Sequence, residues 1–127
     1  MTAGKFGTAI NCMDGRVQEP VIAWLKERYG LDYVDMITEA GPDKALAAEP
    51  GDVIESIRRR VGISVTQHGS EVIAVVGHHD CAGNPVSKEA HWQHIEKAVG
   101  VVRSWDSDVS VLGLWVDEDW SVEVVTE

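Results

Sequence analysis

The stretch EVIAVVG at residues 71–77 decides the fold class of this 127-residue chain. Its continuous apolar run indicates a strand that is buried on both faces. Strands of that kind occur in parallel sheets whose two faces are covered by helices. We therefore expect an α/β protein with a largely parallel sheet, in which residues 71–77 form one strand.

Strand-like and helical patterns alternate along the rest of the chain. We predict helices at 20–29, 52–65 and 87–105, and further strands at 8–12, 33–38, 109–116 and 121–125. Ala-Gly-Pro at 40–42 is interpreted as a break after the strand at 33–38. The short acidic gap at 117–119 indicates a hairpin that ends in an antiparallel edge strand. The chain is thus expected to form a single domain, 1–127, with about four parallel strands, one antiparallel edge strand and flanking helices.

The composition argues against several classes of partner. A net charge of −10 disfavours nucleic acid and anionic membranes as the main partners. No run of 18 apolar residues is present, so we expect no membrane span, and residues 1–5 lack the apolar stretch of a signal peptide. Two cysteines are too few for a disulfide framework. We therefore expect a cytoplasmic protein in a reducing compartment.

Chemically active side chains follow two of the predicted strands. The motif CMDGR at 12–16 ends the strand at 8–12, and GHHDCAG at 77–83 ends the strand at 71–77. In open α/β sheets, sites form beyond the carboxyl ends of the strands. If both strands are parallel, the two motifs lie at the same edge of the sheet and are able to meet.

Cys12, His78 and Cys81 are the predicted metal ligands. Thiolate and imidazole donors suit Zn²⁺ in a tetrahedral site. Three protein ligands leave the fourth position to water or substrate, as in catalytic zinc sites, whereas structural sites usually have four protein ligands. A water bound there has a pKa of about 7 and supplies hydroxide near neutral pH.

Asp14 and Arg16 are the predicted catalytic pair beside the metal. In an extended segment, residues 12, 14 and 16 face the same side. Asp14 would accept a hydrogen bond from metal-bound water, and Arg16 would hold that carboxylate ionised and oriented. Alternatively, Asp14 takes the fourth ligand position itself and closes the site.

Several simpler interpretations stand beside these predictions. Cys12 and Cys81 would form a disulfide in a redox protein, although a reducing compartment disfavours it. His79 is expected to face solvent. His91 and His94 lie three residues apart on one predicted helix, where they would relay protons or form an exposed pair, and we favour the exposed pair. The tryptophans are expected in the core or at an interface.

The two motifs resemble those of the β-class carbonic anhydrases, and the chain is similar to a small, truncated member of that family. The resemblance lies in CxDxR at 12–16 and in a GHxxCG-like motif at 77–82. It implies that Cys12, His78 and Cys81 bind zinc and that Asp14 and Arg16 position a zinc-bound hydroxide. The implied lyase reaction is the reversible hydration of carbon dioxide to bicarbonate, and the implied assembly is a homodimer or a higher homo-oligomer.

The sequence departs from the family pattern outside the metal motifs. Members usually carry serine at the position of Gly15 and glycine at that of Ala82, and the family's Arg-Asn-Ala-Gly-Asn stretch matches residues 38–42 only at Ala40 and Gly41. The family's long N-terminal helices have no counterpart here. Related proteins hydrolyse carbonyl sulfide or carbon disulfide with the same centre, which makes that activity an alternative. A non-catalytic zinc-stabilised binding or regulatory protein is another.

Overall fold

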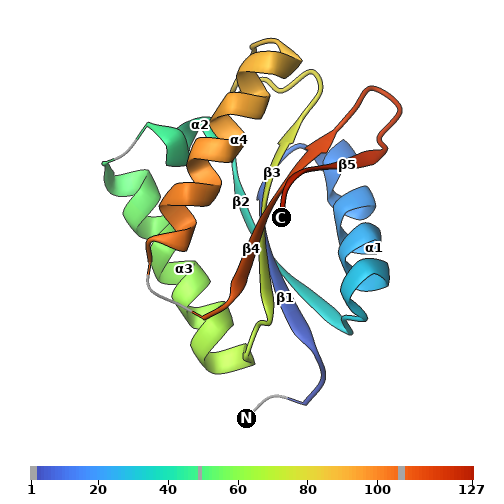
Figure 1. Cartoon of the computed structure of the whole chain (residues 1–127), viewed down its shortest axis with the longest axis vertical. Helices are drawn as coiled ribbons and strands as arrows, with labels where there is room; N and C mark the ends of the chain where they lie inside the picture. Colours follow the sequence, from blue (N-terminus) through green and yellow to red (C-terminus); the bar gives the residue numbers. More distant parts are fainter. Residues whose placement is uncertain (1–2, 49, 106–107) are drawn as a thin grey trace.

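A single five-stranded sheet organises the computed structural model of the chain, which describes residues 3–48, 50–105 and 108–127 (Figure 1). The strand order is β2-β1-β3-β4-β5. Neighbouring strands are parallel except β5, which pairs antiparallel with β4 at one edge. The predicted mostly parallel sheet with an antiparallel edge strand is therefore confirmed. The strands are β1 (Phe6–Cys12), β2 (Tyr33–Glu39), β3 (Val72–His78), β4 (Ser110–Val116) and β5 (Val122–Thr126).

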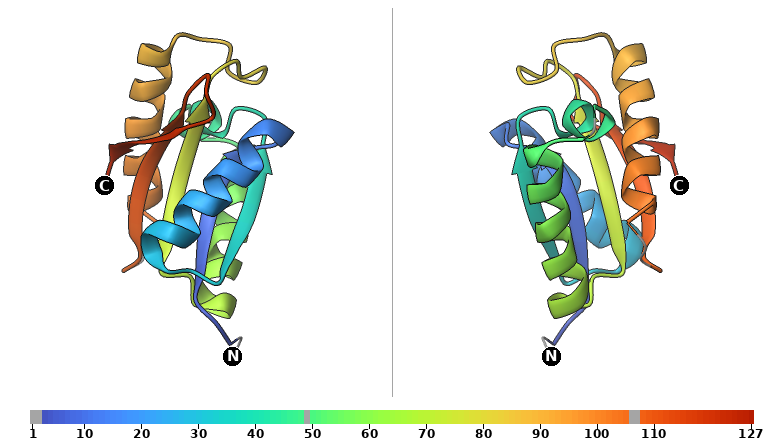
Figure 2. Two further views of the ribbon diagram at one scale, coloured as in Figure 1. Left: turned by 90° about the vertical axis from the view of Figure 1, so that its right-hand side faces the viewer. Right: turned by 90° about the vertical axis from the view of Figure 1, so that its left-hand side faces the viewer.

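Helices cover both faces of the sheet, as Figure 2 shows from two sides. The elements are the 3₁₀ helix η1 (Gly15–Val17) and the helices α1 (Gln18–Tyr29), α2 (Pro42–Ala47), α3 (Asp52–His68) and α4 (Lys88–Arg103). α1 packs on one face through Val21 and Leu25, and α3 and α4 pack on the other through Ile57 and Ile95. This double covering explains why all seven residues of β3 are buried. No helix in the described part of the chain is long and apolar enough to cross a lipid bilayer.

The predicted end of the first helix at residue 29 is confirmed, whereas α3 continues to His68, past the predicted end at 65, and α4 ends at Arg103, before the predicted end at 105. Gly30 follows α1 with φ of 65°, and Gly69 follows α3 with φ of 69°. Both conformations are left-handed, which glycine adopts without a Cβ penalty. At the start of α4, the Ser87 side chain accepts a hydrogen bond from the Ala90 amide at 3.2 Å. That bond caps one of the free amides of the first turn.

Helix α2 was not predicted. The Ala-Gly-Pro stretch at 40–42 does end β2, but Pro42 also begins this short helix rather than a loop. Proline suits the first helical turn because the amide it lacks would have no partner there. α2 packs against α4 and buries Asp43 and Leu46. The interpretation of 40–42 as a simple break was therefore incomplete, and it concealed a buried carboxylate near the predicted metal site.

Candidate metal centre

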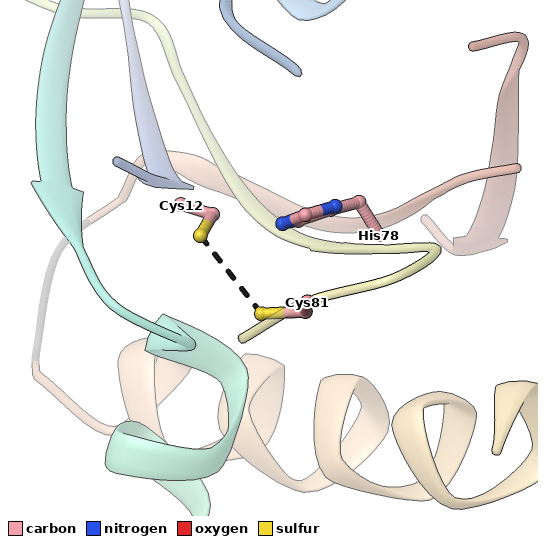
Figure 3. Close-up of side chains that lie close together, drawn as sticks. All are labelled: Cys12, His78 and Cys81. Carbon is pink, nitrogen blue, oxygen red and sulfur yellow. Dashed lines mark hydrogen bonds between the residues drawn. The ribbon is translucent and has the colours of Figure 1, made fainter. Parts of the chain in front are cut away.

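The sheet brings together the three side chains that the sequence predicted as metal ligands. Cys12 and His78 are the last residues of the neighbouring parallel strands β1 and β3, and Cys81 lies three residues after His78. All three are buried, and their ligand atoms lie within 4.8 Å of one another. Figure 3 shows the imidazole directed toward the two sulfur atoms. The predicted meeting of the two motifs therefore occurs, across the middle of the sheet's carboxyl edge.

The distance between the sulfur atoms fits a shared zinc ion. Two thiolates on one tetrahedral zinc, each about 2.3 Å from the metal, lie about 3.8 Å apart. Cys12 Sγ and Cys81 Sγ lie 3.9 Å apart, and both cysteines are free thiols. The predicted alternative of a disulfide is thus not what the structure has, since the sulfur atoms stand at a hydrogen-bonding separation.

His78 has one nitrogen left for a metal. Its Nδ1 lies 2.7 Å from the backbone oxygen of His79, so the Nδ1–H donates to that carbonyl. The other nitrogen, Nε2, is buried without a hydrogen-bond partner. A metal-binding histidine characteristically donates its second ring N–H to an outer acceptor, which fixes the tautomer and the ring orientation. The buried Nε2 lone pair is therefore ready for a ligand bond.

The two thiols share a proton unequally. The hydrogen bond from Cys81 is the largest influence on Cys12, and it lowers the pKa of the Cys12 thiol to about 4. The same bond is the largest influence on Cys81 and raises the pKa of that thiol. Backbone amides of Gly41 and Asp14 further favour the Cys12 thiolate. The lowered pKa favours Cys12 as the thiolate that a metal ligand must be, and Cys81 would release its proton on metal binding.

The segment after β1 is a turn and not the extended strand that the sequence analysis assumed. Asp14 caps η1 by accepting a hydrogen bond from the Arg16 amide at 2.9 Å. The Asn11 side chain holds this turn from below, because it accepts from the Cys12 amide at 2.9 Å and donates to the Val17 carbonyl at 3.2 Å. The Gln18 side chain donates to the Cys12 carbonyl. The extended-strand argument for residues 12, 14 and 16 was therefore wrong, and sequence reasoning missed Asn11 and Gln18.

Asp14 and Arg16 nevertheless form the expected pair. Arg16 Nε and Nη2 donate to the two Asp14 carboxylate oxygens at 3.0 and 2.6 Å, and the hydrogen bond to Arg16 lowers the pKa of Asp14 to about 2. The guanidinium also reaches Asp80 at 3.3 Å and lies 4.9 Å from the ring centre of Trp120. The Asp14 oxygens do not join the compact group of Cys12, His78 and Cys81 atoms among the described residues. The Asp14 carboxylate is therefore held by Arg16 and is not one of the grouped ligand atoms.

The surface next to this pair is hollowed. A depression of about 560 Å³ is lined by Gly15, Arg16 and Trp120 among others. A second depression, of about 480 Å³, borders Cys81 and Trp115. Trp115 is buried and Trp120 is partly buried, in keeping with the core positions predicted for tryptophan. The first depression leaves room for a small molecule beside Arg16.

The predicted exposure of the remaining histidines is confirmed for His79 and wrong for His91. His79 is exposed, as predicted. The preferred interpretation of His91 and His94 as an exposed pair was wrong, because His91 is 1% exposed and lies 2.7 Å from the buried Asp43 carboxylate. His91 lies four residues before Ile95, on the apolar stripe of α4, and that spacing could have revealed its burial. Asp43 and Asn84, which also meet His91, carry no local signal and were missed.

Comparisons with known proteins agree with the predicted family and fold. A family model described as "Putative carbonic anhydrase" matches residues 2–126. Among solved structures, beta-carbonic anhydrase isoform I from Trichomonas vaginalis is 15% identical, with a TM-score of 0.65 over 94% of this chain and 81% of its own. No curated protein matches the chain.

Two further solved structures share the fold. The apo form of a carbon disulfide hydrolase is 15% identical, with a TM-score of 0.63 over 91% of this chain and 76% of its own. One of two tetrameric beta-carbonic anhydrases from Sordaria macrospora is 13% identical, with a TM-score of 0.65 over 98% of this chain and 81% of its own. At such low identity these likenesses concern the fold alone.

Proposed function

The chain belongs to the carbonic anhydrase family whose model it matches, and from that premise we propose that it catalyses the reversible hydration of carbon dioxide to bicarbonate with a zinc ion. The observation that carries the proposal is the buried group of Cys12, His78 and Cys81, whose sulfur atoms are spaced for one tetrahedral zinc. Zinc in such a site activates a water molecule for attack on carbon at neutral pH.

Each residue of the site has a distinct task in this proposal. Cys12, His78 and Cys81 would hold the metal, which would supply a water molecule activated for attack on carbon. Asp14 would accept a hydrogen bond from that water molecule and orient it for the attack. Arg16 keeps the Asp14 carboxylate ionised and oriented through its two parallel hydrogen bonds.

Zinc analysis together with a stopped-flow hydration assay tests the proposal. We expect about one zinc per chain, and carbon dioxide hydration by the zinc-loaded protein well above that of the metal-free protein and of free zinc. Protein without zinc would contradict the metal role. Zinc-loaded protein without hydration activity would contradict the carbon dioxide activity and leave the two alternatives below.

Hydrolysis of carbonyl sulfide or carbon disulfide is the second candidate activity. The fold similarity to a carbon disulfide hydrolase favours it, and the same metal ligands and the same Asp14–Arg16 pair would serve it. Assays with each substrate on one protein preparation separate these activities. Zinc binding without turnover of any of the three substrates would favour a zinc-stabilised binding or regulatory role.

We also propose a homodimer or a higher homo-oligomer in the cytoplasm. Tetrameric carbonic anhydrases with this fold support self-association, and the low cysteine content supports a reducing compartment. Light scattering coupled to size exclusion tests the assembly, and a monomer at micromolar concentration would contradict it. Cell fractionation tests the location.

A further inference from the structure

A second polar cluster lies behind the metal motif and has no place in the proposed reaction. Asp43 on α2, His91 on α4 and Asn84 in the loop after Cys81 are all at most 1% exposed. The Asp43 Oδ2 atom lies 2.7 Å from His91 Nδ1 and 3.2 Å from Asn84 Nδ2. The same Asn84 nitrogen lies 3.0 Å from Nδ1 of the half-buried His94. The cluster thus ties two helices to the loop that carries Cys81.

One arrangement of hydrogen atoms satisfies these contacts. Asp43 Oδ2 accepts one hydrogen from His91 Nδ1 and one from the Asn84 amide. The second amide hydrogen of Asn84 then goes to His94 Nδ1, which must be the unprotonated nitrogen of that ring. Both donors of Asn84 are used, so its side chain has a single orientation. Asp43 is the acceptor on which this orientation depends.

The cluster touches the metal motif at two points. A Cβ at Gly77, the residue before His78, would lie 2.9 Å from Asp43 Oδ2 and 3.2 Å from His91 Nδ1. β3 therefore passes directly over the carboxylate, where only glycine leaves room. In the loop, the backbone amide of Asn84 donates to the Cys81 carbonyl at 3.3 Å. The side chain of Asn84 is held by Asp43 while its backbone closes the turn that begins at Cys81.

The same turn presses against the start of α2. A Cβ at Gly83 would lie 2.5 Å from the Ala40 carbonyl carbon, and a Cβ at Gly41 would lie 2.7 Å from the Gly83 carbonyl carbon. The two backbones are thus in direct contact, two residues before Asp43 in the sequence. Backbone packing and the Asp43–Asn84 hydrogen bond together determine where the turn of residues 81–84 lies.

A packing role alone does not account for this carboxylate. Burial of a charged or polar group costs free energy unless all its hydrogen bonds are made, and Asp43 Oδ1, Asn84 Oδ1 and His91 Nε2 have no partner. An apolar side chain at position 43 would bury α2 against α4 without that cost. Costs of this kind persist where a site requires a defined geometry.

We propose that Asp43 is a positioning residue for the metal centre: through Asn84 it holds the turn of residues 81–84, and thereby the Cys81 sulfur, in place beside Cys12 and His78. The inference rests on the proposed function, because it presumes that these sulfur atoms bind a metal. It assigns Asp43, Asn84 and His91 to support of a ligand, with no contact to substrate.

The chain contains a matched control for this cluster. Asp35 Oδ2 lies 2.6 Å from His68 Nδ1 and 2.6 Å from the Ser64 hydroxyl, so it too accepts from a histidine and a second donor. Asp35 pairs with Thr8 of β1 in the sheet. Thr8 lies four residues before Cys12, which places this pair about 13 Å from Cys12 along the strand. Asp35→Asn changes the same kind of carboxylate–histidine pair far from the metal ligands, at a partly buried position.

Cobalt(II) titration of the metal-free full-length protein tests the inference, with the thiolate-to-metal charge-transfer absorption as the readout. Wild type is expected to bind about one Co²⁺ in a tetrahedral site. Asp43→Asn and, separately, Asn84→Ala should each weaken Co²⁺ and Zn²⁺ affinity about 10- to 100-fold, the range for loss of an outer support of a ligand, and should shift the charge-transfer band. Asp35→Asn should leave affinity and band unchanged.

The outcomes separate the two proposals. Folded Asp43→Asn and Asn84→Ala proteins, verified by circular dichroism, that bind both metals like wild type would overturn the positioning role alone. Equal losses of affinity in Asp43→Asn and Asp35→Asn would also overturn it, because general destabilisation would then suffice. Wild type that binds neither metal would overturn the zinc function and the positioning role together. If Asp43→Asn fails to fold, Asn84→Ala decides, since it leaves the Asp43–His91 pair intact.

Discussion

The two ends of the sheet treat buried polar groups differently. At the amino end, five side chains from β1, β2, α3 and the loop between α3 and β3 form a continuous network with contacts of 2.6 Å. None of them leaves an unpartnered buried atom among the described residues. The network stabilises the junction of α3 with the sheet. Its members are Thr8, Asp35, Ser64, His68 and Ser70.

At the carboxyl end, the buried polar groups are incompletely satisfied. Every buried side-chain nitrogen or oxygen without a partner in the described part of the chain belongs to this end. One of them, His78 Nε2, is a predicted metal ligand, and the others lie in or beside the Asp43 cluster. The polar groups at the amino end therefore contribute to stability, whereas buried polar atoms at the carboxyl end lack hydrogen bonds around the expected metal site. The unpartnered atoms belong to Asp43, His78, Asn84, His91 and Trp115.

Removal of a predicted metal ligand at the carboxyl end should have the largest effect on zinc content and on stability. Cys12→Ala is expected to reduce zinc from about one per chain to near zero and to lower the thermal unfolding temperature, because metal binding contributes to the stability of the folded state. Elemental analysis and a thermal melt measure both. Met13→Ala is the control, since the adjacent Met13 side chain is 66% exposed. Full zinc content in Cys12→Ala would exclude this residue as a ligand.

Neutralisation of Asp14 should separate metal binding from turnover. Asp14→Asn is expected to retain zinc but to lose about 10²- to 10⁴-fold in hydration rate, the usual contribution of a positioned acid–base group. Asp80→Asn should cost far less, because the Asp80 carboxylate is 70% exposed where it pairs with Arg16. Stopped-flow assays compare the two variants at equal zinc content. Wild-type activity in Asp14→Asn would remove the role assigned to this carboxylate.

Addition of one methyl group should change the free energy of unfolding in opposite directions at the crowded carboxyl end and at an open helix surface. Gly77→Ala would place a Cβ 2.8 Å from Ile95 and 2.9 Å from Asp43, and overpacking of this kind costs about 1–3 kcal/mol. Gly62→Ala, on α3, meets no atom within 4 Å and should stabilise the helix by about 0.5–1 kcal/mol. Urea denaturation of the metal-free variants measures both free energies of unfolding. Changes of the same sign would contradict the tight approach of β3 to Asp43.

A substitution in the network at the amino end of the sheet is expected to have the smallest effect on the metal site. Ser64→Ala removes the hydroxyl that links Thr8, Ser70 and Asp35, which should cost about 1–3 kcal/mol because buried partners lose their hydrogen bonds. Zinc affinity should stay at the wild-type value. Urea denaturation and a zinc competition assay test the two parts. A weakened zinc site would show that the two ends are energetically coupled.

Local patterns in the sequence were sufficient to predict most of the fold and the three grouped side chains of the candidate metal site. The apolar run at 71–77 identified a doubly covered strand, and Gly30 correctly predicted the end of α1, where the chain turns left-handed. The meeting of Cys12 with His78 followed from one rule: the carboxyl ends of parallel strands share an edge. Helix α2 was not predicted, because Gly-Pro serves equally as a loop signal, whereas Asp-Gly at 14–15 is an ordinary turn signal and the structure has a turn there.

By itself, the sequence determined the succession of the five strands and of helices α1, α3 and α4 along the chain. It also determined the donor types at residues 12, 78 and 81, because hydrophobic periodicity and donor type are properties of short segments. Only the tertiary structure decided that Asp43, Asn84 and His91 share one buried site behind Cys81. Those three residues come from separate elements, and their contact exists only where α2, α4 and the loop of residues 81–84 pack against β3. Side chains with no local pattern acquire a common role through packing, and packing is a property of the whole chain.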